Sequence, residues 1–529
     1  MMGIQESEGG KFFYTNISIA QRVRRDHPLR KIAARVDFDF IYREVADKYG
    51  TRGNVSVPPP VILKLMLLLV FYNVRSEREL MATLPERLDW LWFLGYDLDT
   101  KIPDHSVLSK ARKRWGAEVF RNFFERIVIQ CVEAGLVDGG KIFVDASLVE
   151  ADASNNSVID TQSLKHQLKK NYRELEARLA ERQRSYGSEE NEESEESEEN
   201  EEDEEDEKGE ESGDDIGFGG GGGEVSPARS GRYRKVNGRY ISSTDPDAAI
   251  VGRGKPDLFY QVHRSVDEAH EIITATAVTP GDVSEGHMLE ELLRRHRETT
   301  GKPASTVVAD SKYGTIDNFL SLYDQGIKAH MPDLCRSASV REEKRGIFTE
   351  AHFRYDRERD IYLCPAGKEL KPKSLHRGRG SIDYGASRAD CEACPLRSGC
   401  TTNKAGRTVK RHCRQEDLDV MLEESRSKAS KKDIKKRQHL MERSFARGKR
   451  YGYDRARWRR LWRVSIQEYL VCAVQNIQVL LKRGGGPVKD PAVIARVLKV
   501  AHTRAFVLFS KFFERFSFAK KGRPITCPA

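Results

Sequence analysis

The chain has 529 residues, a length that allows roughly two to four domains with a sizeable core. Apolar residues make up 38% and charged residues 32%, which is typical of a globular protein and argues against a membrane-embedded one. The formal net charge is +9, but residues 188–215 hold nineteen acidic residues against one lysine, so the remainder carries +27. This surplus favours a polyanionic partner, most simply nucleic acid, although ordinary solubility explains many modestly basic proteins.

The N-terminal segment lacks the pattern of a secretory signal, because Glu6, Glu8 and Lys11 interrupt its first apolar stretch. The most apolar segment, Val61 to Tyr72, has only twelve residues and contains a lysine, so it predicts a buried helix and not a membrane span. We therefore expect a cytoplasmic protein with no membrane partner. The chain has nine cysteines, an odd number with a cluster in mid-chain, which favours a metal site over structural disulfides.

Helical patterns dominate residues 1–135, which are predicted to form an all-α N-terminal domain that binds DNA. Three prolines at 58–60 precede apolar residues at helical spacing, and Ser76 with Glu79 resembles a capping box. A further helix is expected at 107–114, and its cations are Lys110, Arg112, Lys113 and Arg114. These cations either enter a DNA groove or form the solvated outer face of a helical bundle, and the sequence does not decide between the two.

From residue 136 the pattern changes to short strands and helices, which predicts an α/β core at 136–160 and 233–334. The predicted strands are Ile142–Asp145, Leu258–Val266, Ile272–Val278 and Thr306–Asp310, with helices at 286–295 and 315–323. A helical arm at 161–187 and a disordered acidic and glycine-rich linker at 188–232 separate the first strand from the second. The linker either imitates DNA or only improves solubility, and the second interpretation is the simpler.

Three acidic residues stand where a metal-dependent DNA-cutting site would place them. Asp145 and Asp310 each end the apolar run of a predicted strand, and Glu442 lies in a basic, helix-like segment. Three converging carboxylates would repel one another without a divalent cation, so we predict a site for two Mg²⁺ or Mn²⁺ ions. Glu150 and Asp152 compete with Asp145 for this role, but they follow the strand and do not end its apolar run.

The 132 residues between Asp310 and Glu442 are too many for one strand-to-helix connection, so residues 335–430 are predicted to be a small cysteine-rich insertion. Its spacing is Cys391-x2-Cys394-x5-Cys400, with Cys364 upstream, and these four thiolates could bind one structural Zn²⁺ tetrahedrally. Cys413 or His412 could replace one ligand. The alternative is a loop of unliganded thiols.

The segment 431–485 is predicted to hold the helix of Glu442 and a core helix at 464–481 that packs against the sheet. Tyrosines and tryptophans alternate with arginines between these two helices, a mixture that suits a DNA backbone and its flanking bases. The basic tail at 486–529 is either a DNA-contacting arm or a loose terminus.

Several motifs together resemble the DDE transposases of bacterial insertion sequences, in the branch with a helical N-terminal domain and a cysteine-bearing insertion. The N-terminal motifs are His27-Pro28-Leu29-Arg30, Ser76-Glu77-Arg78-Glu79-Leu80, Trp92-Phe93-Leu94-Gly95 and Pro103-Asp104-His105-Ser106. The core motifs are Val144-Asp145-Ala146-Ser147, Val278-Thr279-Pro280-Gly281-Asp282 and Ala309-Asp310-Ser311-Lys312-Tyr313-Gly314. The resemblance implies a ribonuclease H-like catalytic core, a mixed sheet with flanking helices.

The resemblance also implies an activity, which is cutting DNA at terminal inverted repeats and joining the freed 3′-OH ends to target DNA. It implies a homodimer on double-stranded DNA, associated with the nucleoid when bound, and no small-molecule substrate. The family's helix follows a Tyr, Arg, Glu, Lys pattern, in which Arg437, Glu442 and Lys449 take the last three places, while Ile434 stands near the place of the Tyr. Arg437 and Lys449 would contact DNA phosphates. A non-catalytic DNA-binding regulator and a plain metal-dependent nuclease are the alternatives.

Overall fold

The computed structural model describes residues 18–50, 54–162, 173, 236–252, 256–333 and 346–484. The predicted acidic linker and the predicted basic tail lie outside the described residues, as does nearly all of the predicted helical arm. The start of the predicted insertion, up to residue 345, also lies outside them.

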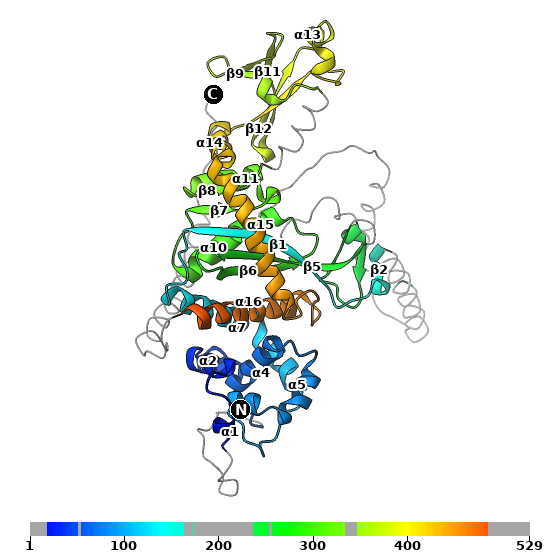
Figure 1. Ribbon diagram of the computed structural model, residues 1–529. Helices are drawn as coiled ribbons and strands as arrows, with labels where there is room; N and C mark the ends of the chain where they lie inside the picture. The colour runs from blue at the N-terminus through cyan, green and yellow to red at the C-terminus, as the bar shows by residue number, and fades with distance from the viewer. Residues whose placement is uncertain are drawn as a thin grey trace, which may run out of the picture.

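The N-terminal region is helical, as predicted, and Figure 1 shows its first helices at one end of the molecule and α7 alongside α16, next to the sheet. Its elements are α1 (Ile19–Arg22), α2 (Pro28–Arg35), α3 (Ile41–Glu44), η2 (Ala46–Lys48), α4 (Pro59–Phe71), α5 (Glu77–Thr83), η3 (Leu84–Glu86), α6 (Leu88–Leu94) and α7 (Ser106–Glu133). The predicted cap is present, because the Ser76 hydroxyl accepts from the Glu79 amide at 3.1 Å. Gly116 interrupts α7 with φ 74°, a backbone conformation that glycine adopts without steric cost.

The core is a mixed sheet whose five main strands lie in the order β6-β5-β1-β7-β8. Its strands are β1 (Lys141–Glu150), β4 (Ala249–Val251), β5 (Asp257–Asp267), β6 (Ile273–Pro280), β7 (Thr306–Val308) and β8 (Lys328–His330). Strands β6, β5 and β1 are antiparallel, whereas β1, β7 and β8 are parallel. The short β4 pairs with the same edge of β5 as β6 does. The predicted fold class, α/β with a mixed sheet, is confirmed.

Helices cover both faces of this sheet. They are α10 (Leu289–Thr300), α11 (Ile316–Asp324), α14 (Gln415–Arg426), α15 (Lys428–Lys449) and α16 (Leu461–Arg483). Ile142 and Val144 of β1 pack with the buried residues of α10 and α11, whereas Phe143 packs with those of α15 and α16. Side chains alternate along a strand, so Asp145 falls on the face of Phe143, which α15 crosses (Figure 1).

Helix α16 lies between the sheet and the N-terminal helices, in contact with β6, α7, α4 and α2. It agrees with the predicted core helix at 464–481 and is longer at both ends. Among the described helices, α16 is the one whose length and hydropathy would allow a membrane span, but 78% of its most apolar window is buried inside the protein. That burial is what the core helix of a globular protein shows.

The cysteine-bearing insertion forms a second sheet at the end of the molecule opposite the N-terminal helices (Figure 1). It is an antiparallel meander of β9 (Arg354–Asp356), β10 (Ile361–Leu363), β11 (Glu369–His376), β12 (Ser381–Ala386) and β13 (Thr408–His412). Helical turns α13 (Arg388–Glu392) and η9 (Arg397–Gly399) lie between β12 and β13. Two further short strands, β2 (Val158–Asp160) and β3 (Tyr240–Ser242), pair beside the core.

Candidate functional site

Asp145 lies on β1 of the central sheet, and Asp310 lies just beyond the end of β7, the parallel neighbour of β1. The prediction that Asp145 ends its strand is wrong, because β1 continues to Glu150 along its antiparallel pairing with β5. On the other side, the pairing of β1 with β7 stops at Phe143 and Val308, so the β7 side of Asp145 is open. Asp310 lies one residue beyond the end of β7 and caps the turn η6 (Ser311–Tyr313), where its carboxylate accepts from the Lys312 amide at 3.0 Å.

A third acid, Glu285, completes a compact group that we call the acid group. It consists of Asp145, Glu285 and Asp310, each of which offers an oxygen within 4.8 Å of the others. Glu285 opens the turn η5 (Glu285–Met288), four residues after the end of β6, and is only 6% exposed. Glu285 was not predicted from the sequence, because the helix expected there began one residue later. An acid in the first turn of a helix that follows a core strand was the available signal.

Two cationic side chains and one side-chain amide contact the acid group. The Arg437 guanidinium donates to the Asp145 carboxylate at 2.5 Å, from the face of α15 that crosses β1. The Lys312 ammonium donates to Glu285 at 2.5 Å, and the Gln261 amide donates to the same oxygen at 2.7 Å. The side chain of Lys312 is 63% exposed, so the group borders solvent on that side.

The electrostatics of the acid group favour a bound cation. Burial raises the pKa of Asp145 even though Arg437 opposes the shift, and burial likewise raises the pKa of Glu285 against the effect of Lys312. For both carboxyls, the cost of burying the ionised form therefore exceeds the stabilisation that the neighbouring cation provides. Burial also raises the pKa of Tyr313, whose fully buried hydroxyl has no hydrogen-bond partner and interacts electrostatically with all three acids.

The residues present fit a divalent cation. Three carboxylates supply hard oxygen ligands of the kind that Mg²⁺ and Mn²⁺ prefer. An unpartnered buried hydroxyl beside them is a polar atom that a hydrated ion or its substrate would satisfy. The arrangement could therefore bind metal and place it against a phosphodiester that enters from the solvent side.

Glu442 lies outside the acid group, although it shares α15 with Arg437. Five residues of helix separate the two, which places Glu442 about 7.5 Å further along the axis and turned about 140° around it. Glu442 is exposed and accepts from the Gln438 amide at 3.3 Å. Lys449, also exposed, lies at the end of the same helix. The metal-binding role of Glu442 and the phosphate contact of Lys449 stay predictions.

The four cations predicted to contact DNA from the N-terminal region divide into two kinds. Lys110, Lys113 and Arg114 are exposed on the first segment of α7, where contact with DNA stays a prediction. Arg112 requires a correction, because it is only 4% exposed and forms an ion pair with Glu77. Its guanidinium also lies 4.0 Å from the centre of the Trp458 ring, so Arg112 holds segments of the protein together.

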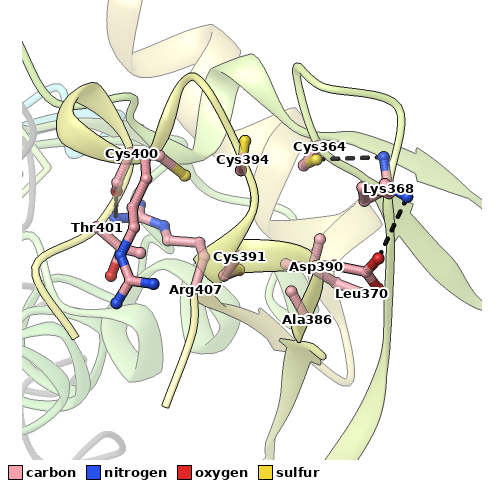
Figure 2. A pocket seen from close by; sticks show the side chains of 11 residues that line it. Cys364, Lys368, Leu370, Ala386, Asp390, Cys391, Cys394, Cys400, Thr401 and Arg407 are labelled. Atoms are coloured by element: carbon pink, nitrogen blue, oxygen red, sulfur yellow. Dashed lines mark hydrogen bonds and ion pairs between the residues drawn. The ribbon is translucent and has the colours of Figure 1, made fainter. Parts of the chain in front are cut away.

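The four cysteines predicted as zinc ligands lie in the second sheet, far along the chain from the acid group. Cys364, Cys391, Cys394 and Cys400 all line one small cavity, and Figure 2 shows them arranged around it. His412 and Cys413, the predicted substitutes, do not line this cavity. Cys413 is exposed.

The fold and the acid group define an α/β protein with a carboxylate site suited to divalent cations. Residues 17–114 match a family model described as a transposase domain (DUF772), and residues 363–481 match one described as a transposase DDE domain. No curated protein and no solved structure matches the chain.

Together the two matches support a DDE transposase of an insertion sequence. This family implies a ribonuclease H-like core, DNA binding, and a DNA-cleaving and strand-transferring enzyme that uses divalent metal. The second match contains Arg437 and Glu442, whereas Asp145, Glu285 and Asp310 lie between the two matched ranges.

Proposed function

We propose that this transposase cuts DNA at the terminal inverted repeats of its element and joins the freed 3′-OH ends to target DNA. Both steps would take place at one site for two Mg²⁺ or Mn²⁺ ions. The observation that carries the proposal is the acid group, three carboxylates gathered beside the central strand of a transposase core. Double-stranded DNA is the substrate, and a homodimer would hold the two ends of the element.

The ion-binding residues are Asp145 and Asp310, with Glu442 as the ligand expected from the sequence. Glu285 is added as a further ligand because it shares the acid group with the two aspartates. When bound, the ions activate the attacking water or 3′-OH and stabilise the leaving oxygen. Arg437 would orient the Asp145 carboxylate, and the exposed Lys312 would meet a phosphate at the mouth of the site.

The test uses purified full-length protein, Mg²⁺ and labelled DNA that carries the element's ends. Asp145→Asn and Asp310→Asn should abolish cleavage and joining while DNA binding is retained, because each removes a charged metal ligand. Glu442→Gln should abolish both steps as well, and Glu285→Gln should weaken the apparent Mg²⁺ affinity roughly 10- to 100-fold. Asp152→Asn is the matched control, since this carboxylate follows β1 but pairs with Arg459 outside the acid group.

The outcomes separate the proposal from its alternatives. Binding without Mg²⁺-dependent cutting would leave the non-catalytic regulator, and cutting without joining would leave the plain nuclease. If Glu442→Gln retained full activity while Glu285→Gln abolished it, Glu285 would replace Glu442 as the third ligand. Light scattering of the protein with and without DNA ends tests the homodimer.

A further inference from the structure

The second sheet has only a small hydrophobic core to stabilise its fold. Its buried cluster is formed by Phe353, Tyr362, Leu370, Tyr384, Cys400 and Val409. Most residues of β11 are exposed, so one long strand contributes little apolar burial. Domains of this size usually need a covalent or metal cross-link in addition to their core. The cysteines are the residues of this sheet that could provide one.

Four cysteines from three local segments converge on one cavity. Cys364 directly follows β10, Cys391 lies in α13 with Cys394 just beyond it, and Cys400 follows η9. The cavity has a volume of about 20 Å³, which is room for a single small occupant. Figure 2 shows the thiols around this space, with Arg407 beside Cys400. Bound zinc would draw the sulfurs inward, since ligand atoms at 2.3 Å from a common ion lie close to one another.

The backbone around the cavity is shaped to hold sulfur ligands. The Lys368 amide donates to the Cys364 sulfur at 3.3 Å, across a tight turn closed by the Gly367 amide and the Cys364 carbonyl at 2.8 Å. Such N–H donors orient a ligating thiolate and stabilise its charge. On the other side Gly406, with φ 101°, brings its backbone against Cys391, where a Cβ would lie 3.3 Å from the sulfur.

Among the described residues, the acid group is the one set of three or more potential ligands whose ligand atoms lie within 4.8 Å of one another. The four sulfurs are therefore not all within that distance of one another, and zinc binding would bring them together across the cavity. Cys413 lies outside this set, because it is exposed and does not line the cavity.

We propose that Cys364, Cys391, Cys394 and Cys400 bind one structural Zn²⁺ that cross-links the second sheet. Four thiolates form a closed tetrahedral site with no open position, so this zinc takes no part in phosphoryl transfer. It ties the turn after β10 to α13 and η9, and thereby adds to the small apolar core of the meander. The proposal does not depend on the metal chemistry of the acid group.

The first test is the metal content of the full-length protein, purified under reducing conditions without chelator and measured by plasma mass spectrometry. We expect about one zinc per chain in the wild type, in Cys413→Ser and in Asp145→Asn. The double variant Cys391→Ser/Cys394→Ser should lose it. Retention of zinc in Asp145→Asn shows that the ion does not reside in the acid group.

A second test covers the case in which the double variant fails to fold. Wild-type protein, stripped by a strong chelator and reloaded with Co²⁺, should show the intense thiolate charge-transfer absorption of a tetrahedral sulfur site. Chelation should also increase trypsin cleavage within 346–412, and Zn²⁺ should reverse the increase. Zinc-free wild-type protein without the Co²⁺ absorption, or a mass that shows two disulfides among the four cysteines, would overturn the proposal.

Discussion

At the scale of single residues, the acid group contains carboxyls whose ionised forms are not fully stabilised by the neighbouring cations. Burial raises the pKa of both Asp145 and Glu285, and their partners Arg437 and Lys312 do not reverse either shift. A carboxyl whose pKa is higher in the folded protein than in the unfolded chain stabilises the fold at low pH, and this stability is lost as the pH rises through the folded pKa. A divalent cation restores it by pairing with the ionised form.

We therefore predict that the increase in melting temperature produced by Mg²⁺ grows with pH. The increase should be small near the usual carboxyl pKa of about 4 and larger toward neutral pH, because the ion binds only ionised carboxylates. Thermal unfolding in chelator and in excess Mg²⁺, at several pH values, measures the difference. Asp145→Asn should remove most of the pH dependence, whereas Asp152→Asn should preserve it. An increase that is the same at every pH would contradict the explanation.

At the scale of elements, a buried ion pair joins both long C-terminal helices to the sheet. Arg264 of β5 and Glu468 of α16 are fully buried and share two contacts, at 2.7 and 2.8 Å. Arg264 also donates to the Ser444 carbonyl of α15 at 3.0 Å, and Thr276 of β6 donates to Glu468 at 2.6 Å. Arg264 is the cross-strand partner of Asp145, so this network fixes the sheet directly beside the acid group, on the same face.

We predict that removing one member of this pair is far more costly than removing an exposed pair. Glu468→Gln or Arg264→Met should lower the free energy of unfolding by about 3–5 kcal/mol, because each leaves its partner buried without charge compensation. Arg294→Met, which breaks the exposed pair with Glu298 on α10, should cost less than about 0.5 kcal/mol. Urea unfolding gives both values. A loss below about 1 kcal/mol for the buried variants would rule out the anchoring role.

At the scale of the whole molecule, the N-terminal helices and the C-terminal segment form one structure. The largest hydrophobic cluster runs without a break from α2 and α4 through α7 to α16 and one face of the sheet. Polar contacts join the same parts, since Arg112 pairs with Glu77 and stacks on Trp458, and Arg457 donates to Asn73. The region expected to read DNA is thus packed against the helix that completes the core.

We predict that replacing two neighbouring cations of α7 affects different properties, stability for Arg112 and DNA binding for Lys113. Arg112→Ala should destabilise the protein by about 3 kcal/mol, because it removes a buried guanidinium and leaves the Glu77 carboxylate, whose side chain is only 14% exposed, without its partner. Lys113→Ala should leave stability within about 0.5 kcal/mol, weaken DNA binding and lower its salt dependence by about one counterion. Denaturation and salt-dependent binding assays measure the two properties. If the dependence of DNA affinity on salt concentration is unchanged in Lys113→Ala, the first segment of α7 does not contact DNA through this residue.

The residues of the acid group could be predicted only where a short stretch of sequence indicated their position. The proximity of Asp145 and Asp310 was predictable because each follows a run of apolar residues that forms a strand, and these strands are parallel neighbours. Glu285 was not, because its place beside them depends on the pairing of β5 with β6 and β1, which no short segment encodes. Arg112 was misplaced for a similar reason, since its aromatic partner, Trp458, lies 346 residues further along the chain.

The position of α16, the last described helix yet the one at the centre of the protein, has a consequence for synthesis. The ribosome releases α7 and the first aspartate long before α16 leaves the exit tunnel, a delay on the order of 20 to 70 s at ordinary translation rates. During that interval the sheet lacks Glu468, and the helix of Arg437 lacks its support. A nascent polypeptide would therefore display its N-terminal helices while still unable to break a DNA strand, so that breakage waits for translation to finish.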